Sequence, residues 1–403
     1  MTHMTPRQRF LATLHYQPRD RAYLCDFGFW DETFVLWYDQ GLPRWVDKTN
    51  SDTYFGLDGF ERFFVGEEGA AFISRNKLLR TGGLKLALCP QFEERILEDR
   101  GDSVILQQCD GVRVRRSKFM SSIPPHEGHL LVDRQSWAEH YRWRLDPRTP
   151  ERYPRNWDET IAAWSDPQRD DILVLPAGSL YGWLRNWMGV ENLSLLVYRD
   201  PALFEEMVTT VADCLYGVLE RVLQAGARFD AAAYWEDMCY NAGPLLGPKH
   251  FRRFLVPHYR RINDLLHRHG IEVIFVDCDG KIDALLPLWL EAGVNCMFPI
   301  EVGTWGADPC RFRREFGRDL LMLGGFDKHI LAQSPDAIER EVARLAPLVE
   351  EGGYIPFCDH RVPPDVPLAN YQHYIRCARR VWGRGVNLPE CGLPDAGQSA
   401  NST

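Results

Sequence analysis

Carboxylates stand where several apolar runs of this sequence end. The run "IEVIFV" is followed by Asp277 and Asp279, and "DAAAYW" is followed by Glu236 and Asp237. The run "NCMFPI" ends in Glu301. Grouped carboxylates hold divalent cations or exchange protons, and a buried one is costly to desolvate without such a partner. The alternative is that they cap the helices that follow, and for Asp279 both interpretations stay open.

Three further chemical groups end the run "GYIPF": Cys358, Asp359 and His360. A thiolate and an imidazole at one strand end are typical metal ligands, although a buried thiol is by itself more often inert. Near the N-terminus, Asp26 ends the run "AYLC" in the same way. We therefore expect Asp26 and His360 to belong to a site together with the other strand-end groups.

The segment "GSLYGWLRNWMGVENL" is dense in aromatic residues around one cation. Trp183 and Trp187 could form a wall for a flat ligand, with Arg185 binding an anionic group of that ligand. The alternative is a hydrophobic plug beneath the fold. Because the segment follows a strand end, we include all three residues among the candidate binding residues.

The elements that would position these residues form a repeated pattern. From Asp170 onward six short apolar runs are each followed by helical sequence, such as helices expected over 248–269 and 281–292, which is typical of parallel βαβ units. With two more strands upstream, this predicts an α/β (β/α)8 TIM barrel, whose active site lies at the C-terminal ends of its strands. An open doubly wound sheet is less favoured, because no glycine-rich phosphate loop follows the first strand.

Two additions to the barrel are expected. Thr5 and Pro6 begin an N-terminal helical segment, and the alternating runs in 92–118, separated by turn signals, predict a β-hairpin insertion. A single barrel domain should then cover 1–385, with 386–403 as a flexible C-terminal tail.

Composition limits the class of partner. The 403 residues carry a net charge of −9, which disfavours a protein that holds nucleic acid or an anionic membrane surface. No apolar stretch approaches the roughly 18 residues of a membrane-spanning helix. Eleven cysteines without a C-x-x-C pair indicate reduced thiols. We expect a cytoplasmic protein that acts on a small molecule.

Four stretches resemble the uroporphyrinogen decarboxylase-like superfamily, which includes the tetrapyrrole decarboxylase and the methyltransferases of corrinoid-dependent methyl transfer. They are "TPRQRFLATLHYQPRDRAYLCDF", "VDCDGKIDALLPLWLEAGVNCMFPIEV", "LMLGGFDKHIL" and "EEGGYIPFCDHRVPPDVPLANYQHYI". The decarboxylase is expected to carry an arginine-rich segment near its N-terminus, but "LCDFGFWDETFVLWYDQGLP" contains no arginine. The resemblance is therefore nearer to the methyltransferase branch.

In that branch a His-x-Cys pair and a Cys after the last strand bind zinc. These positions correspond here to Asp277, Asp279 and Cys358, which the resemblance implies as the metal ligands. Asp277 would also be catalytic, and Glu236 or His360 would donate a proton or act as a further metal ligand. The remaining candidates would bind the substrate: Asp26, Trp183, Arg185, Trp187, Asp237 and Glu301.

The resemblance implies a metal-dependent methyltransferase that moves a methyl group between a small methylated or methoxylated substrate and a corrinoid on a partner protein. The alternatives are a uroporphyrinogen decarboxylase, which is a carboxy-lyase of porphyrin biosynthesis, and a non-catalytic tetrapyrrole-binding barrel. A homodimer is compatible with each of these functions.

Overall fold

The computed structural model describes residues 3–59, 83–119 and 124–383. The chain divides into two compact units. The first comprises Met1–Glu61, Asp170–Ile172 and Met297–Thr403, and the second comprises Arg62–Arg169 and Leu173–Cys296. The expected tail, 386–403, lies outside the described residues, and the single domain over 1–385 stays a prediction.

The second unit is built on three parallel strands, β5 (Val174–Gly178), β6 (Ala231–Trp235) and β9 (Ile274–Asp277), with β6 in the middle. Nearly every residue of these strands is buried, as a parallel sheet covered on both faces requires. The main helices of the unit are α6 (Trp157–Ser165), α7 (Gly182–Met188), α8 (Val190–Arg199), α9 (Pro201–Gln224), α10 (Pro248–Phe254), α11 (Val256–Arg268) and α12 (Leu286–Glu291).

Prolines correct two of the helix boundaries expected from the sequence. The predicted helix over 248–269 is divided into α10 and α11, because Pro257 lies in the first turn of α11. The predicted helix over 281–292 begins only at Leu286, with Pro287 in its first turn. Proline lacks the N–H that would continue a preceding helix, so it favours a new start at both places.

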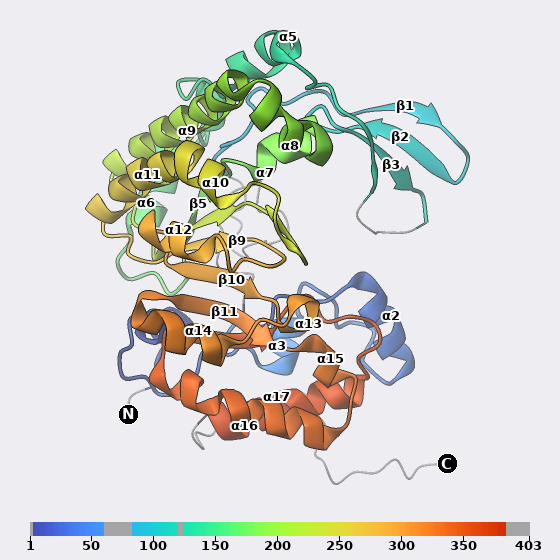
Figure 1. Cartoon of the computed structure of the whole chain (residues 1–403). Helices are drawn as coiled ribbons and strands as arrows, with labels where there is room; N and C mark the ends of the chain where they lie inside the picture. Colours follow the sequence, from blue (N-terminus) through green and yellow to red (C-terminus); the bar gives the residue numbers. More distant parts are fainter. Residues whose placement is uncertain (1–2, 60–82, 120–123, 384–403) are drawn as a thin grey trace. The chain divides into compact units, whose positions relative to one another are not determined.

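The expected insertion is an antiparallel sheet that Figure 1 shows in cyan. Strands β1 (Arg95–Asp99), β2 (Ser103–Gln107) and β3 (Arg113–Ser117) follow one another, and β4 (His126–Gly128) adds a fourth strand that the sequence pattern did not predict. Four short helical segments follow β4: α5 (Arg134–Ser136), η1 (Trp137–Tyr141), η2 (Arg142–Leu145) and η3 (Pro150–Arg152).

The first unit contains β10 (Cys296–Ile300), β11 (Leu321–Phe326) and β12 (Tyr354–Cys358), with β11 in the middle and parallel to β12. Its helices are α1 (Pro6–Leu14), α2 (Asp31–Asp39), α3 (Ser51–Phe55), α13 (Val302–Trp305), α14 (Pro309–Phe316), α15 (Lys328–Leu331), α16 (Pro335–Glu351) and α17 (Leu368–Trp382), and η4 (Gly317–Asp319) follows α14. The parallel α/β fold is thus confirmed, together with the N-terminal helix. Closure into a ring of eight strands stays a prediction.

The run that begins at Ala22 is not a strand, contrary to expectation. The Ala22 N–H donates to the carbonyl of Trp382 at 3.2 Å, and the Leu24 N–H donates to the Asp58 carboxylate at 2.9 Å. These backbone groups are therefore satisfied outside a ladder. A few residues farther along, Phe29 forms an isolated bridge with Val362.

Two expectations about class can be compared with the described residues. The ten cysteines among them are free thiols, as their spacing predicts. Of the helices in the described part of the chain, none combines the length and apolar character needed to cross a membrane.

A buried ion-pair network ties the N-terminal segment together. Arg9 donates to both carboxylate oxygens of Asp20, at 2.8 and 2.7 Å, and to Asp58 at 2.7 Å. Arg21 donates to the two oxygens of Asp58 at 2.6 and 2.8 Å. Burial alone would raise the pKa of Asp20, but the hydrogen bonds from Arg9 and from backbone N–H groups outweigh it and lower that pKa to about 2.

The lowered pKa of Asp20 predicts a loss of stability in acid. The ordinary pKa is 3.8, so the stabilisation is fully present above that pH and is lost as pH falls through about 2. We expect the free energy of unfolding to fall by about 2 kcal/mol from this group between pH 4 and 2. Denaturant titrations at a series of pH values measure it. Asp20→Asn should flatten this part of the profile, whereas Asp39→Asn, at an exposed position of α2, should not.

Candidate active site

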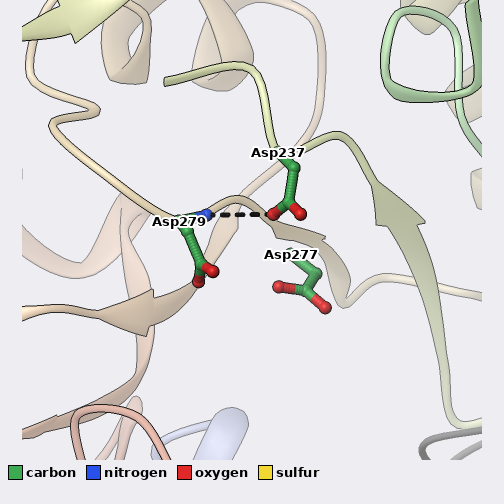
Figure 2. A group of neighbouring side chains, drawn as sticks. All are labelled: Asp237, Asp277 and Asp279. Carbon is green, nitrogen blue, oxygen red and sulfur yellow. Dashed lines mark hydrogen bonds between the residues drawn. The ribbon is translucent and has the colours of Figure 1, made fainter. Parts of the chain in front are cut away.

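Three carboxylates converge at the ends of β6 and β9 and form what we call the acid cluster: Asp237, Asp277 and Asp279 (Figure 2). One oxygen from each lies within 4.8 Å of the others. All three side chains are half-buried, and the Asp279 N–H lies 3.4 Å from Oδ1 of Asp237. Three like charges so close repel one another, and a cation among them would relieve that repulsion.

Backbone contacts join the loop that follows β6 to the loop that follows β9. Trp235 pairs with Asp277 in the parallel ladder, and the Glu236 N–H donates to the Asp277 carbonyl at 2.8 Å. Farther along, the Lys281 N–H donates to the Tyr240 carbonyl at 2.9 Å. Asp237 itself has a φ of 39°, which is rare for a residue with a side chain. The register of β6 on β9 thus determines where the acid cluster forms.

Gly280 lies at the tightest approach between these loops. Its φ is +86°, and a Cβ there would meet the Cys239 carbonyl oxygen at 2.6 Å and its carbon at 2.7 Å. We expect Gly280→Ala to destabilise the protein by about 2 kcal/mol and to weaken metal binding, because the loop that carries Asp279 must move. Chemical denaturation and metal titration measure the two effects.

Gly270 offers a matched control for this substitution. Its φ of +79° is similar, but nothing lies within 4 Å of the position that a Cβ would take. Gly270→Ala should therefore carry the cost of backbone strain alone and leave metal binding unchanged. Equal metal affinity in the Gly280→Ala and Gly270→Ala proteins would contradict the importance of the close approach.

Arg185 is attached to the acid cluster by its guanidinium. Nη1 donates to the Asp237 carbonyl at 2.6 Å, and Nη2 lies 3.8 Å from Oδ2 of the same residue. Nη2 also donates to Asn186, and the guanidinium carbon lies 5.5 Å from the centre of the Trp235 ring. Arg185 therefore neutralises part of the charge of the cluster and holds Asp237.

The two candidate tryptophans differ in their surroundings. Trp183 and Trp187 stack with ring centres 6.1 Å apart and planes at 19°. Trp187 is buried and also contacts Tyr141 at 5.5 Å, which is typical of a core residue. Trp183 is half-buried, so only its ring retains a partly open surface for a ligand.

Glu236 is fully buried and receives five hydrogen bonds. Three come from backbone N–H groups at the start of α7, those of Leu180, Tyr181 and Gly182, at 2.8, 2.8 and 3.0 Å. The Ser179 hydroxyl donates at 3.0 Å and the Tyr259 hydroxyl at 2.5 Å. Burial raises the pKa of Glu236, against the effect of these donors. The arrangement favours a positioning role over the proton-donor role expected from the sequence.

Four candidate residues belong to the first unit: Asp26, Glu301, Cys358 and His360. Asp26 is buried and accepts from the Tyr371 hydroxyl at 2.6 Å and the Cys358 N–H at 3.2 Å. Burial raises its pKa to about 7, although the hydrogen bonds from Tyr371 and Cys358 oppose the change. Cys358 is buried, and burial raises its pKa well above the ordinary value. Glu301 accepts from the Thr304 hydroxyl at 2.8 Å.

His360 completes this group. Its ring stacks on Trp30, with centres 6.0 Å apart and planes at 24°, and meets the edge of Phe27 at 5.3 Å. The proton-donor role expected of His360 stays a prediction, as does the metal set of Asp277, Asp279 and Cys358. The acid cluster contains the two aspartates of that set, and Asp237 joins them.

Residues 185–381 match the family model described as Uroporphyrinogen decarboxylase (URO-D). These residues are therefore similar to the URO-D family. The resemblance seen in the sequence is thereby confirmed, and the acid cluster lies inside the matched region.

Curated relatives include the uroporphyrinogen decarboxylases of Syntrophotalea carbinolica and Sodalis glossinidius, which are 29% and 27% identical over 198 and 196 residues. Each match covers 47% of this chain and 52% of the relative. The chain thus spans about half the length of the curated relatives it matches. A solved methyltransferase from Methanosarcina mazei has a similar fold, with a TM-score of 0.55 at 14% identity, over 93% of this chain and 98% of that one.

Within the matched region, the sequence predicts Asp277 and Asp279 as metal ligands and Asp237 as a substrate-binding residue, and the structure brings all three together. Glu236 and Asp237 follow β6, and Asp237 leaves the extended conformation with a φ of 39°. The available signal for Asp237 is its position just after an apolar run, like that of Asp279. From the sequence, Asp359 has no expected role beyond its position next to Cys358. In the structure Asp359 is fully buried and accepts from the Gly303 and Lys328 N–H groups at 2.6 and 3.0 Å.

Burial and donors therefore divide the strand-end carboxylates into two classes. Asp26, Glu236 and Asp359 are buried and accept backbone N–H groups from neighbouring segments, which favours a positioning role. The binding role predicted for Asp26 and the catalytic role predicted for Glu236 stay predictions. The acid cluster is half-buried, and its oxygens approach one another. Three carboxylate oxygens fit a divalent cation, and as hard ligands they suit Mn²⁺ or Mg²⁺ and also occur on Zn²⁺.

Proposed function

We propose that this protein is a metal-dependent methyltransferase of the uroporphyrinogen decarboxylase-like superfamily. It would transfer a methyl group between a small methylated or methoxylated substrate and a corrinoid carried by a partner protein. The observation that carries the proposal is the acid cluster, whose three oxygens lie within 4.8 Å of one another at the ends of β6 and β9. Strand ends are where parallel α/β enzymes hold their reacting groups.

The residues of the second unit would have separate roles in the reaction. Asp237, Asp277 and Asp279 would hold the cation, and Arg185 would keep Asp237 in place through its carbonyl. A bound divalent cation supplies a Lewis acid that polarises the oxygen or nitrogen bearing the methyl group. The partly open ring of Trp183 would contact the substrate.

Further support comes from the fold and the charge. A methyltransferase is among the solved structures of similar fold. The net charge of −9 disfavours an anionic macromolecule as substrate and suits a small molecule or a partner protein.

Methyl transfer to a free corrinoid tests the proposal. The protein, loaded with Mn²⁺ or Zn²⁺, is mixed with cob(I)alamin and with methylated amines, methyl thioethers or methoxylated aromatics, and methylcobalamin formation is followed by its absorbance. We expect one donor class to react, and the reaction to stop after treatment with a chelator. Absence of transfer from all three classes, or transfer that a chelator leaves unchanged, would reject the proposal.

A carboxy-lyase is the second candidate, because the curated relatives named above are uroporphyrinogen decarboxylases. Such an enzyme would need no metal. Loss of carboxyl groups from uroporphyrinogen in the presence of a chelator would favour it over methyl transfer, and chromatography of the porphyrin products measures that loss.

A further inference from the structure

Arg361 is a half-buried cation held between aromatic rings of the first unit. Its guanidinium carbon lies 5.2 Å from the centre of the Trp30 ring and 5.7 Å from that of Phe27. The electron-rich faces of such rings attract a guanidinium and leave its N–H groups available at the edge of the plane. Rings thus hold the cation without using its hydrogen-bond donors.

Backbone pairing determines where this guanidinium lies. The Val362 N–H donates to the Gly28 carbonyl at 2.9 Å, and the Trp30 N–H donates to the Val362 carbonyl at 3.3 Å. The Thr33 hydroxyl donates to the same carbonyl at 2.9 Å. The segment that carries Arg361 is therefore fixed beside the one that carries the two rings.

Within the part of the chain that the structure describes, Arg361 makes no ion pair and no hydrogen bond. Two other arginines of this unit behave differently, since Arg9 and Arg21 are both matched to carboxylates. A partly desolvated cation without a counter-charge is costly. That cost is accepted at sites where a ligand supplies the negative charge.

The neighbours of Arg361 describe the rest of the ligand. His360 stacks on Trp30, and Phe27 meets both His360 and Phe298 edge to face, the latter at 4.9 Å. Phe27, Trp30 and His360 are half-buried, so parts of the rings stay accessible. A cation beside apolar rings is suited to a small molecule that carries an anionic group on a flat or apolar body.

We propose that Arg361 is an anion-binding residue, which holds the carboxylate or phosphate group of a small ligand by two parallel N–H···O bonds. The ligand's apolar body contacts Trp30 and Phe27. This site is separate from the acid cluster in its residues, and it does not depend on the proposed methyl transfer. It would restrict the ligands of the protein to acids or phosphates.

Calorimetric titration of the full chain with three probes tests this inference. Benzoate carries a carboxylate on a flat ring, benzamide is its neutral analogue, and inorganic phosphate is the other anion source. A chelator is present in all titrations, so that no metal binds the anions. We expect benzoate or phosphate to bind, and benzoate to bind at least about 10-fold more tightly than benzamide if a carboxylate is the ligand group.

Two variants of Arg361 separate charge from geometry. Arg361→Gln should weaken anion binding by at least about 10-fold, and Arg361→Lys should weaken it several-fold, because an ammonium keeps the charge and loses the planar fork. Both should remain folded, since Arg361 makes no ion pair with the described residues that would be broken. The melting temperature and the circular dichroism spectrum confirm the fold.

Arg311→Gln is the matched control. Arg311 also lies over a ring, that of Phe312 at 4.7 Å, but it pairs with Glu315 at 3.9 Å, and its loss should leave anion binding unchanged. Binding of phosphate without benzoate supports the site and assigns it to phosphate esters. Failure of the wild-type protein to bind either anion, or equal anion binding by the wild-type and Arg361→Gln proteins, would overturn the inference.

Discussion

Asp277→Asn is expected to raise the dissociation constant for Mn²⁺ at least about 100-fold. Loss of a residue that only supports a metal ligand weakens metal binding by up to about 100-fold, so loss of a charged ligand should cost at least as much. The physical reason is the loss of one of three negative charges whose oxygens lie within 4.8 Å of one another. An amide keeps the shape of the side chain and remains a weak oxygen ligand. Isothermal titration with Mn²⁺ measures the change, and methyl transfer should fall in parallel.

The control for Asp277→Asn is Asp264→Asn, which removes the same charge from an exposed position of α11. Long-range electrostatics would lower the metal affinity in both proteins alike, and the screening of exposed charges by salt keeps that contribution small. Unchanged Mn²⁺ affinity in the Asp277→Asn protein, with the fold intact, would contradict the assignment of the acid cluster.

Glu236→Ala is expected to lower the free energy of unfolding by about 4 kcal/mol or more, the largest stability change that we predict. The substitution leaves five buried donors without an acceptor, and each such group costs about 1–3 kcal/mol. Some of the loss is recovered if water enters the space. Denaturant titration measures the difference, and Glu191→Gln, at an exposed position of α8, is the matched surface control.

Two milder variants distinguish this structural role from catalysis. Tyr259→Phe removes a single hydroxyl donor from Glu236 and should cost about 1 kcal/mol. Glu236→Gln keeps the volume but directs an amide NH2 at surrounding donors, so we expect it to be destabilising as well. If Glu236→Gln kept full stability and lost only activity, Glu236 would be a proton donor and the positioning role would be wrong.

Much of the fold follows from local signals in the sequence. Continuous apolar runs such as "AAAYW" and "IFVD" are recognisable because both faces of a parallel sheet are covered. The run after Ala22 has the same character, yet its backbone groups bind Asp58 and Trp382. That outcome depends on contacts with distant residues, which a local pattern does not contain.

The candidate site shows the same division. Asp277 and Asp279 could be found from their position at the end of β9, and the role of Asp237 requires the register of β6 on β9. The five donors to Glu236 come from the start of α7 and from α11, so no local pattern reveals them. Likewise, the sequence around Arg361 does not show that its guanidinium lies over aromatic rings and pairs with no carboxylate among the described residues. That property appears only when its neighbours in the structure are known.

Anomalous X-ray diffraction from crystals grown with Mn²⁺, collected at the manganese absorption edge, tests the central claim most directly. The account predicts an anomalous peak within metal-ligand distance of the carboxylates of Asp237, Asp277 and Asp279. A peak elsewhere with the acid cluster empty, or no peak at a Mn²⁺ concentration that saturates binding in solution, would contradict it.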